Sequence, residues 1–247
     1  MKERERPLTD KIGEGKTKIV YSSSKPNEVL LRFKDSITAL DGEKQDFIPH
    51  KAEVNSAVSA VLFQMLEKEK IPTHFLRLKE PTLMQVRRLK MIPVEVVCRN
   101  IATGKLIKSY PFFKHGERLK SPLVEFFLKD DALHDPLLSE EHMTVSGLAS
   151  KNEVKRLKEL ALKVNRALSR FMTKRGLQLV DFKIEVGRDS QGELRVGDEL
   201  NIDCMRLWDL KTGEVKDKDI YRRGGKLDEV ARTYFQSYKL IVGREFK

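Results

Sequence analysis

Hydrophobic and polar residues alternate strictly from Val180 to Val186, a pattern typical of a β-strand with one buried face. The apolar residues of this run face one side, and the other side presents two acids and a base: Asp181, Lys183 and Glu185. Turn-forming residues follow at 187–192, and Glu193 to Gly197 returns as a second strand. The pattern predicts a β-hairpin that brings Asp198 close to Glu185.

Three other stretches show the 3.6-residue periodicity of amphipathic helices. The first runs from Ala52 to Lys70 and ends before Pro72, because a helix cannot easily continue through proline. The second, Ser150 to Arg175, begins with the Ser-x-x-Glu pattern of a capping box. The third covers Leu227 to Val242. These helices, together with the hairpin, place the chain in the α+β class.

Further strands are predicted at Glu28–Phe33, Thr82–Arg88 and Val94–Arg99. The first of them belongs to an antiparallel β unit near the N-terminus. Residues 89–93 join the last two strands, and we interpret them as a linker between a small β lobe and a larger lobe. Ligands favour such interfaces between domains, so this linker is a candidate contact for an adenine ring.

The composition indicates a globular protein with 247 residues and 40% hydrophobic content, long enough for one large domain or two small ones. The charged N-terminus lacks the apolar region of a secretory signal, and no apolar run approaches the ~18 residues that span a bilayer. Cys98 and Cys204 are too few for a disulfide framework or a cysteine-rich zinc site. We therefore expect a soluble, cytoplasmic protein without a membrane partner.

The net charge of +11, from 48 basic and 37 acidic residues, indicates anionic partners. Nucleic acid is one class of such partner, and phosphate-bearing small molecules are another. Acids are abundant and no short segment is a purely basic tail, so the 34% charged residues also fit an ion-pair-rich surface. Charge favours phosphate-bearing ligands without choosing among them.

The predicted hairpin has the chemistry of a magnesium site. Mg²⁺ typically takes one or two carboxylates, keeps some water and uses phosphate oxygens for its other ligands. Glu185 and Asp198, beside Lys183, match this description for a magnesium ion that carries the phosphates of a nucleotide. The alternation is equally compatible with a solvated hairpin face that bears scattered salt bridges.

A second candidate site for phosphate is the glycine-rich segment near the N-terminus. Gly13 and Gly15 form a Gly-x-Gly turn followed by Lys16 and Lys18, so backbone amides and two ammonium groups would cradle phosphates. It matches neither the P-loop nor the dinucleotide-binding fingerprint, because Asp10 and Lys18 stand where those motifs require glycine. A glycine turn with solvated lysines is the alternative.

A third candidate site begins where the strand ending at Arg99 stops. Arg99 and an asparagine are followed by a glycine bend and Lys105. Arginine suits two-point contacts with carboxylate or phosphate, while lysine supplies a point charge. The segment therefore predicts an anion pocket.

Three segments together resemble the SAICAR synthetase (phosphoribosylaminoimidazole-succinocarboxamide synthase) family. Residues 94–104 (VEVVCRNIATG) resemble one signature, and residues 179–209, with VDFK and CMRLWD, resemble another. Residues 13–18 (GEGKTK) resemble the family's phosphate loop. Residues 129–136 and 217–222 also match, so the resemblance runs over almost the whole chain.

The resemblance implies a ligase that joins L-aspartate to carboxyaminoimidazole ribotide (CAIR) in purine biosynthesis, through an acyl phosphate, with ATP as co-substrate and Mg²⁺ as cofactor. It implies a two-domain fold related to ATP-grasp enzymes: an ATP-binding, β-rich N-terminal domain (1–88) and a larger α+β domain (89–247), with the active-site cleft between them. It also implies a homo-oligomer, with a dimer favoured, and no nucleic-acid partner.

The resemblance also assigns roles to individual residues. Those expected to bind ATP are Gly13, Gly15, Lys16, Lys18, Arg88, Leu89, Met91 and Lys183. Those expected to bind the magnesium ion are Glu185 and Asp198. Those expected to bind the other substrates are Arg99, Lys105, Arg206, Asp203 and Arg222. Those expected near the reacting groups are Lys183, Asp181, Lys129 and Asp203. Lys105 departs from the family pattern, which has serine there, so we expect the ligand to be kept and its contacts to differ.

Two other functions share some of these features. A small-molecule kinase would use the same glycine loop and paired acids, although the HRD-type catalytic loop of protein kinases is absent. A basic nucleic-acid-binding protein would account for the net charge, but no recognisable binding motif supports it. Dependence of ADP formation on aspartate separates the ligase from the kinase.

Overall fold

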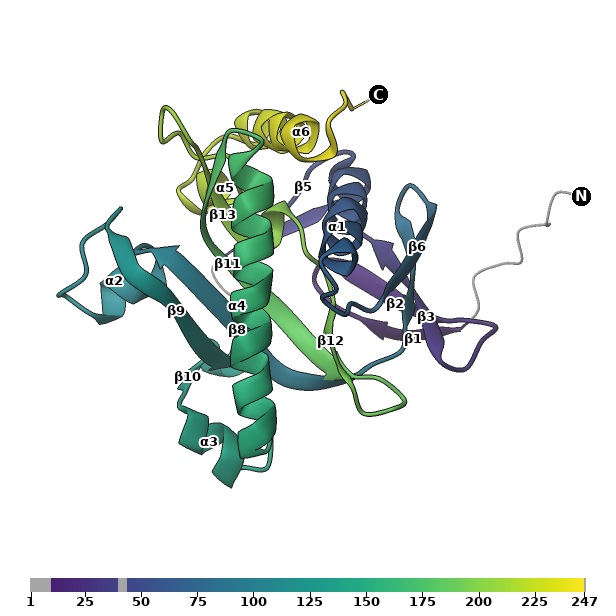
Figure 1. Cartoon of the computed structure of the whole chain (residues 1–247). Helices are drawn as coiled ribbons and strands as arrows, with labels where there is room; N and C mark the ends of the chain where they lie inside the picture. Colours follow the sequence, from purple (N-terminus) through teal and green to yellow (C-terminus); the bar gives the residue numbers. More distant parts are fainter. Residues whose placement is uncertain (1–9, 40–43, 247) are drawn as a thin grey trace, which may run out of the picture.

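Two antiparallel β-sheets, each with helices packed against it, form the body of the protein (Figure 1). The computed structural model describes residues 10–39 and 44–246. The charged segment at residues 1–9, on which the expectation about a secretory signal rests, lies outside the described residues. No helix in the described ranges has the length and apolar character needed to cross a bilayer.

The N-terminal third of the chain builds a five-stranded sheet in the order β1-β2-β3-β7-β6. Its strands are β1 (Lys11–Glu14), β2 (Lys18–Ser22), β3 (Glu28–Phe33), β6 (Phe75–Glu80) and β7 (Leu83–Arg87). A short ribbon of β4 (Ser36–Ala39) and β5 (Lys44–Phe47) stands apart from this sheet. Helix α1 (Lys51–Lys68) packs against the sheet through its buried apolar side chains.

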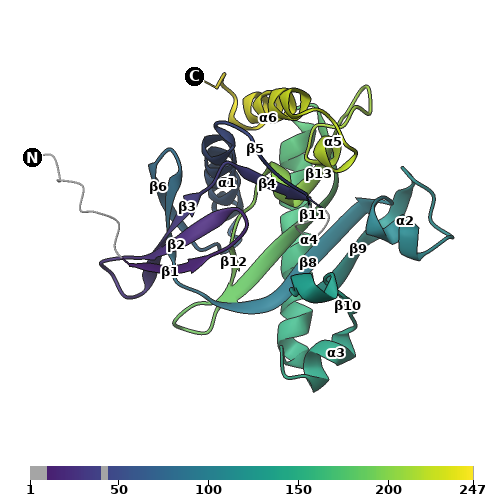
Figure 2. The same ribbon diagram turned by 180° about the vertical axis from the view of Figure 1, so that it is seen from behind.

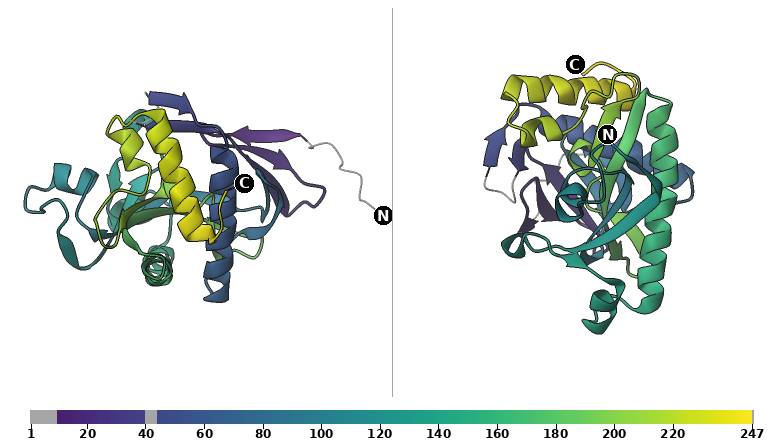
Figure 3. Two further views of the ribbon diagram at one scale, coloured as in Figure 1. Left: turned by 90° about the horizontal axis from the view of Figure 1, so that it is seen from above. Right: turned by 90° about the vertical axis from the view of Figure 1, so that its left-hand side faces the viewer.

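The second sheet follows the order β10-β9-β8-β11-β12, and β13 also pairs with β11. Its strands are β8 (Lys90–Ile101), β9 (Arg118–Leu128), β10 (Leu137–Leu138), β11 (Leu177–Arg188), β12 (Leu194–Gly197) and β13 (Met205–Asp209). Helix α4 (Lys151–Thr173) lies across one face of this sheet, in front in Figure 1 and behind in Figure 2. The N-terminal strands lie on the opposite side of this sheet from α4, as Figure 3 shows from above.

Four further helices complete the described chain. They are α2 (Lys105–Ser109), α3 (Glu140–Val145), α5 (Asp219–Arg222) and α6 (Leu227–Val242), with 3₁₀ turns at Asp131–Leu133 and Ile202–Cys204. Helix α6 packs against α1, which Figure 3 shows from above. The C-terminal helix thereby joins the two halves of the chain, and one hydrophobic core runs through both.

The periodicities in the sequence give the observed helices with small errors at their ends. The predicted helix at Leu227–Val242 has the bounds of α6, and the predicted strand at Glu28–Phe33 has those of β3. Helices α1 and α4 differ from their predicted bounds by one or two residues at each end. Local apolar spacing is enough for α4 and α6, whose buried residues lie along a single face. Helix α1 and strand β3 are buried on more than one side.

Helix α4 begins with the predicted capping box. The Ser150 hydroxyl accepts a hydrogen bond from the Glu153 N–H, and the Glu153 side chain accepts one from the Ser150 N–H. We expect Ser150→Ala to lower the free energy of unfolding by about 1 kcal/mol, because an N–H at the helix start loses its partner. Urea denaturation measures the loss. Ser150→Asp restores the acceptor, and an equal loss in both variants would contradict the capping role.

The expected linker at residues 89–93 is mostly strand. Strand β8 begins at Lys90, which pairs with Arg188, so only Arg88 and Leu89 connect it to β7. Proline has no N–H to donate to a neighbouring strand, so it argues against a strand in a sequence. At a bulge the regular hydrogen bonding is interrupted, and proline is tolerated there. Pro93 lies where the register between β8 and β11 shifts, and it is accommodated there.

The predicted hairpin is confirmed, with Glu185 of β11 opposite Gly197 of β12. The strand is more buried than its alternation implied, because β11 is central in the sheet and both of its faces are covered. Asp198 follows β12 in the left-handed conformation, with φ 56°. This turn directs the chain back across the sheet immediately after the acid.

Candidate active site

One cavity of about 1040 Å³ is lined by side chains from both sheets. The N-terminal part contributes the turn between β1 and β2, and the second part contributes β8, β11 and the segment after β12. The charged row of β11, with Asp181, Lys183 and Glu185, lines this cavity. The alternation in the sequence therefore identified the face of β11 that lines this cavity.

Lys183 lies at the centre of this row. It forms an ion pair with Glu95, which lies on the neighbouring strand β8. Burial would lower the pKa of Lys183, but attraction from Glu95 and Glu185 outweighs this and raises it. Lys183 is thus a permanent positive charge in the cavity.

The two predicted magnesium ligands influence each other. Burial raises the pKa of Glu185, and repulsion from Asp198 raises it further, against the opposing effects of Lys129 and Lys183. The Lys129 ammonium lies 2.6 Å from both carboxylate oxygens of Glu185. The positive charge of Lys129 therefore offsets part of the negative charge of Glu185 and Asp198.

The turn between β1 and β2 contributes lysine side chains to the cavity. Lys18 is buried and forms ion pairs with Asp198 at 3.3 Å and Glu199 at 3.0 Å, while Lys16 pairs with Asp131 at 2.6 Å. The Gly15 N–H, expected to be free for phosphate, donates to the Lys18 carbonyl at 2.8 Å. That amide is used to close the turn, so the loop presents its lysines.

An arginine cluster forms another part of the wall. Asp181 accepts hydrogen bonds from Arg99 at 2.9 Å and Arg206 at 2.8 Å. Asp219 in turn holds Arg206 at 2.9 Å and Arg222 at 2.5 Å. Two buried carboxylates therefore orient three guanidinium groups, each of which keeps further donors for a ligand.

The glycine of the RN-x-x-x-G segment is required by this cluster. Gly104 has φ +59°, and a Cβ there would lie 2.7 Å from Nη2 of Arg206. Any side chain would both strain the backbone and displace the arginine. The glycine bend noted in the sequence therefore serves the close approach of Arg206.

Asp203 lies in the cavity wall with its oxygens already engaged. Its carboxylate accepts hydrogen bonds from Lys51 at 2.6 Å, Asn55 at 3.1 Å and the Tyr234 hydroxyl. Burial would raise the pKa of Asp203, but Lys51 and Lys218 outweigh this and lower it. Asp203 is therefore held as a carboxylate by two helices, α1 and α6.

Several residues predicted for the site do not line the cavity. These are Gly13, Arg88, Leu89, Met91 and Lys105. Leu89 and Met91 instead pack over the glycines of the hairpin, Gly187 and Gly197. The Lys105 ammonium donates to the backbone carbonyls of His134 at 2.9 Å and Asp135 at 2.8 Å. Lys105 thus holds the segment that follows Lys129.

The sequence reasoning missed charged residues of this region, among them Lys51, Glu95 and Lys218. Glu95 had a usable signal, because it alternates with Val94 and Val96 just as Glu185 alternates with its neighbours. Lys51 had none, since its importance comes from its contact with Asp203, which is distant in the chain. Lys218 had only the family match of residues 217–222 as a signal.

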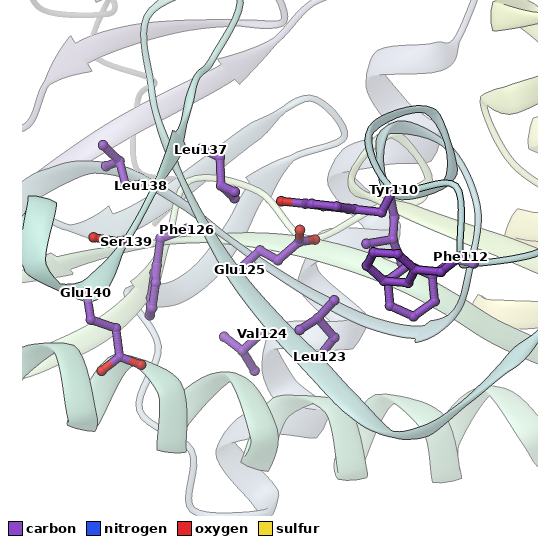
Figure 4. A pocket seen from close by; sticks show the side chains of 12 residues that line it. Tyr110, Phe112, Leu123, Val124, Glu125, Phe126, Leu137, Leu138, Ser139 and Glu140 are labelled. Atoms are coloured by element: carbon purple, nitrogen blue, oxygen red, sulfur yellow. The ribbon is translucent and has the colours of Figure 1, made fainter.

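A smaller, mostly apolar pocket of about 370 Å³ lies between β9 and the residues after α2, and Figure 4 shows the side chains around it. Tyr110, Phe112 and Leu137 contribute to its wall. Glu125 also lines it, and its carboxylate accepts a hydrogen bond from Arg99 at 2.5 Å. Arg99 therefore connects the two pockets through Glu125 and Asp181.

Comparison with known proteins gives one consistent family. The family model described as SAICAR synthetase matches residues 11–239. The phosphoribosylaminoimidazole-succinocarboxamide synthase of Sulfolobus acidocaldarius is 47% identical over 231 residues, which are 94% of this chain and 97% of that protein.

Solved structures agree with the sequence comparison. The structure of the enzyme of the same name from Ehrlichia chaffeensis superposes with a TM-score of 0.91 at 37% identity, covering 96% of this chain and 100% of that one. A SAICAR synthetase in complex with ADP superposes with a TM-score of 0.89 at 38% identity, covering 95% and 99%.

Proposed function

The chain belongs to the SAICAR synthetase family, and we infer from this membership that it joins L-aspartate to the carboxylate of CAIR, with conversion of ATP to ADP and phosphate. It is an ATP-dependent ligase of purine biosynthesis. The two-domain α+β fold is that of the family. The kinase and nucleic-acid-binding alternatives are not favoured, because the relatives match over most of the chain.

The observation that carries the site assignment is the convergence of Lys16, Lys18 and Lys183 on one cavity with two acids. We assign these lysines to the ATP phosphates, since an ammonium group is a compact partner for phosphate oxygens. Nucleotide binding is supported by the ADP complex of a relative. The adenine contact is assigned to the segment of Arg88, Leu89 and Met91, of which Leu89 and Met91 pack against Gly187 and Gly197 of the same hairpin.

We assign Mg²⁺ to Glu185 and Asp198. The fit rests on their mutual repulsion and on the Lys129 ammonium that balances them. Within residues 10–39 and 44–246 there is no group of three acidic, histidine or cysteine side chains that would form a complete protein site. Mg²⁺ is usually bound by one or two carboxylates, and phosphate oxygens and water complete its coordination shell. When bound, Mg²⁺ would neutralise part of the negative charge of the ATP phosphates.

We assign CAIR to the arginine cluster of Arg99, Arg206 and Arg222. The fixed forks of these side chains match the oxygens of a phosphate or a carboxylate. Lys105 contributes by holding the backbone at His134 and Asp135, and thereby the segment that carries Lys129. This role uses its long side chain and accounts for a lysine where the family usually has serine.

The chemistry requires positioning more than a nucleophilic side chain. A carboxylate acylates poorly because oxide is its leaving group. Transfer of the ATP γ-phosphoryl group to a carboxylate oxygen of CAIR releases ADP and gives an acyl phosphate. The aspartate amine then attacks the acyl carbon, phosphate leaves, and the amine loses a proton. Lys183 and Lys129 stabilise the charge of the transferred group, while Asp181 and Asp203 orient the cations around it.

Three further assignments complete the proposal. The boundary between the two domains falls at residues 88 and 89, where the strands of the first sheet give way to those of the second. The protein acts in the cytoplasm, and two buried, unpaired cysteines, Cys98 and Cys204, are in keeping with a reducing compartment. The chain forms a homodimer, as the family resemblance implies.

Release of ADP tests the ligase directly. With CAIR, ATP and Mg²⁺ present, we expect ADP formation to depend on L-aspartate, because the acyl phosphate is consumed only by the amine. Omission of aspartate or of Mg²⁺ should each return the signal to that of the enzyme-free control. A coupled assay for ADP measures the rate, and chromatography identifies SAICAR. Full ADP formation without aspartate would instead indicate a kinase.

A further inference from the structure

Lys218 is a buried lysine in the cavity wall for which the assignments above give no role. Only 8% of its surface is exposed, and it lines the cavity together with Arg206 and Arg222. It lies at the start of α5, one helical turn before Arg222. Among residues 10–39 and 44–246, no hydrogen bond or ion pair joins its ammonium group to another side chain.

The other cations around Lys218 have carboxylate partners. Arg99 and Arg206 share Asp181, and Arg222 is held by Asp219. The carboxylate that attracts Lys218 most strongly is Asp203, which is already bonded to Lys51, Asn55 and Tyr234. A buried charge without its own partner is costly, so its presence indicates that a ligand supplies the partner.

We propose that Lys218 binds a carboxylate of one of the two substrates other than ATP, namely CAIR or L-aspartate. This inference deepens the proposed function and rests on it. The ATP phosphates have separate partners in Lys16, Lys18 and Lys183, which belong to the turn after β1, to the start of β2 and to β11. Lys218 lies on the part of the wall that carries Arg206 and Arg222, where a carboxylate would complete the local charge balance.

The protonation of Lys218 supports this role. Burial lowers the pKa of Lys218 to about 8, and Arg222 and Lys51 lower it as well, against attraction from Asp203 and Glu199. The ammonium form is the one that binds an anion. Affinity for the carboxylate should therefore fall as the pH rises through about 8, and an arginine at this position should not show that fall.

The test compares Lys218→Met, which removes the charge, with Lys218→Arg, which keeps it. Lys216→Met is the matched control, because Lys216 is also buried but pairs with Glu214 and Gln236 outside the cavity. We expect Lys218→Met to raise KM for CAIR or for aspartate at least about tenfold, the effect of a lost charge-assisted contact, with KM for ATP little changed. The substrate whose KM rises is the one that Lys218 binds. Lys218→Arg should recover affinity.

Two measurements separate binding from folding and from turnover. Without ligand, Lys218→Met should raise the midpoint of thermal unfolding, because an uncompensated buried charge is removed. Calorimetry of CAIR and aspartate with each variant reports on Lys218 even if the wild-type chain forms no SAICAR, a result that would reject the ligase but not this contact. Unchanged affinity for both substrates, or a lower midpoint with all three KM values raised, would overturn the role of Lys218.

Discussion

Asp198→Asn should reduce turnover by roughly a thousandfold, because loss of metal-held charge stabilisation raises the barrier by several kcal/mol. Asparagine is a good replacement for a structural reason. Asp198 has φ 56°, a left-handed conformation that asparagine adopts more readily than most residues. The fold should therefore survive while one negative ligand is lost. The same outcome is expected for Glu185→Gln, the other proposed magnesium ligand.

The measurement is ADP release with CAIR, aspartate and ATP present, at several concentrations of Mg²⁺. A higher Mg²⁺ requirement in Asp198→Asn would locate the defect at the metal. Glu193→Gln is the control, because it removes an exposed carboxylate from the same hairpin, where it pairs with Arg156. Circular dichroism verifies the fold of each variant. Near-normal ADP release by Asp198→Asn and Glu185→Gln would reject the magnesium assignment.

Lys51→Met should lower the free energy of unfolding by about 3 kcal/mol near pH 8, because it leaves Asp203 buried without its closest cation. The wild-type pair stabilises the fold above the unfolded pKa of Asp203, near 4, and this contribution is lost as the pH falls through the lowered folded pKa. In the variant, burial instead raises the pKa of Asp203. The difference in the free energy of unfolding between the wild type and Lys51→Met should therefore become smaller as the pH falls and Asp203 takes up a proton.

Urea denaturation at pH 8 and pH 5 measures this difference. Lys68→Met, which removes an exposed lysine from the last turn of the same helix α1, is the control and should leave the free energy of unfolding nearly unchanged. A deficit of equal size at both pH values would mean that packing, rather than the charge of Asp203, accounts for the loss.

Much of the lining of the candidate site was predictable because its charged residues are periodic in the sequence. The alternation through Asp181, Lys183 and Glu185 indicates which side chains share a face, and the turn after β11 indicates that the chain returns to deliver Asp198. Both inferences need only short-range geometry, since side chains two residues apart in a strand lie on one side of it. The same geometry predicts the buried stripes of α4 and α6.

Other features depend on pairs of residues that are far apart in the chain. Lys51 meets Asp203 across 152 positions, and Lys183 meets Glu95 across 88. No local pattern distinguishes Lys51 from the solvated lysines of an ordinary helix. The sequence left open whether these lysines are solvated, and only burial decides it. Lys18 is buried, whereas 40% of the Lys16 side chain is exposed.

By itself, the sequence determined the class of fold, the main helices, the hairpin and the family, because these follow from local periodicity and from motifs of adjacent residues. The tertiary structure alone decided which charges pair, which residues line the cavity and that Lys218 faces it without a partner. The physical reason is that burial and ion pairing depend on distances through space, and sheet packing brings together segments whose separation along the chain carries no such information.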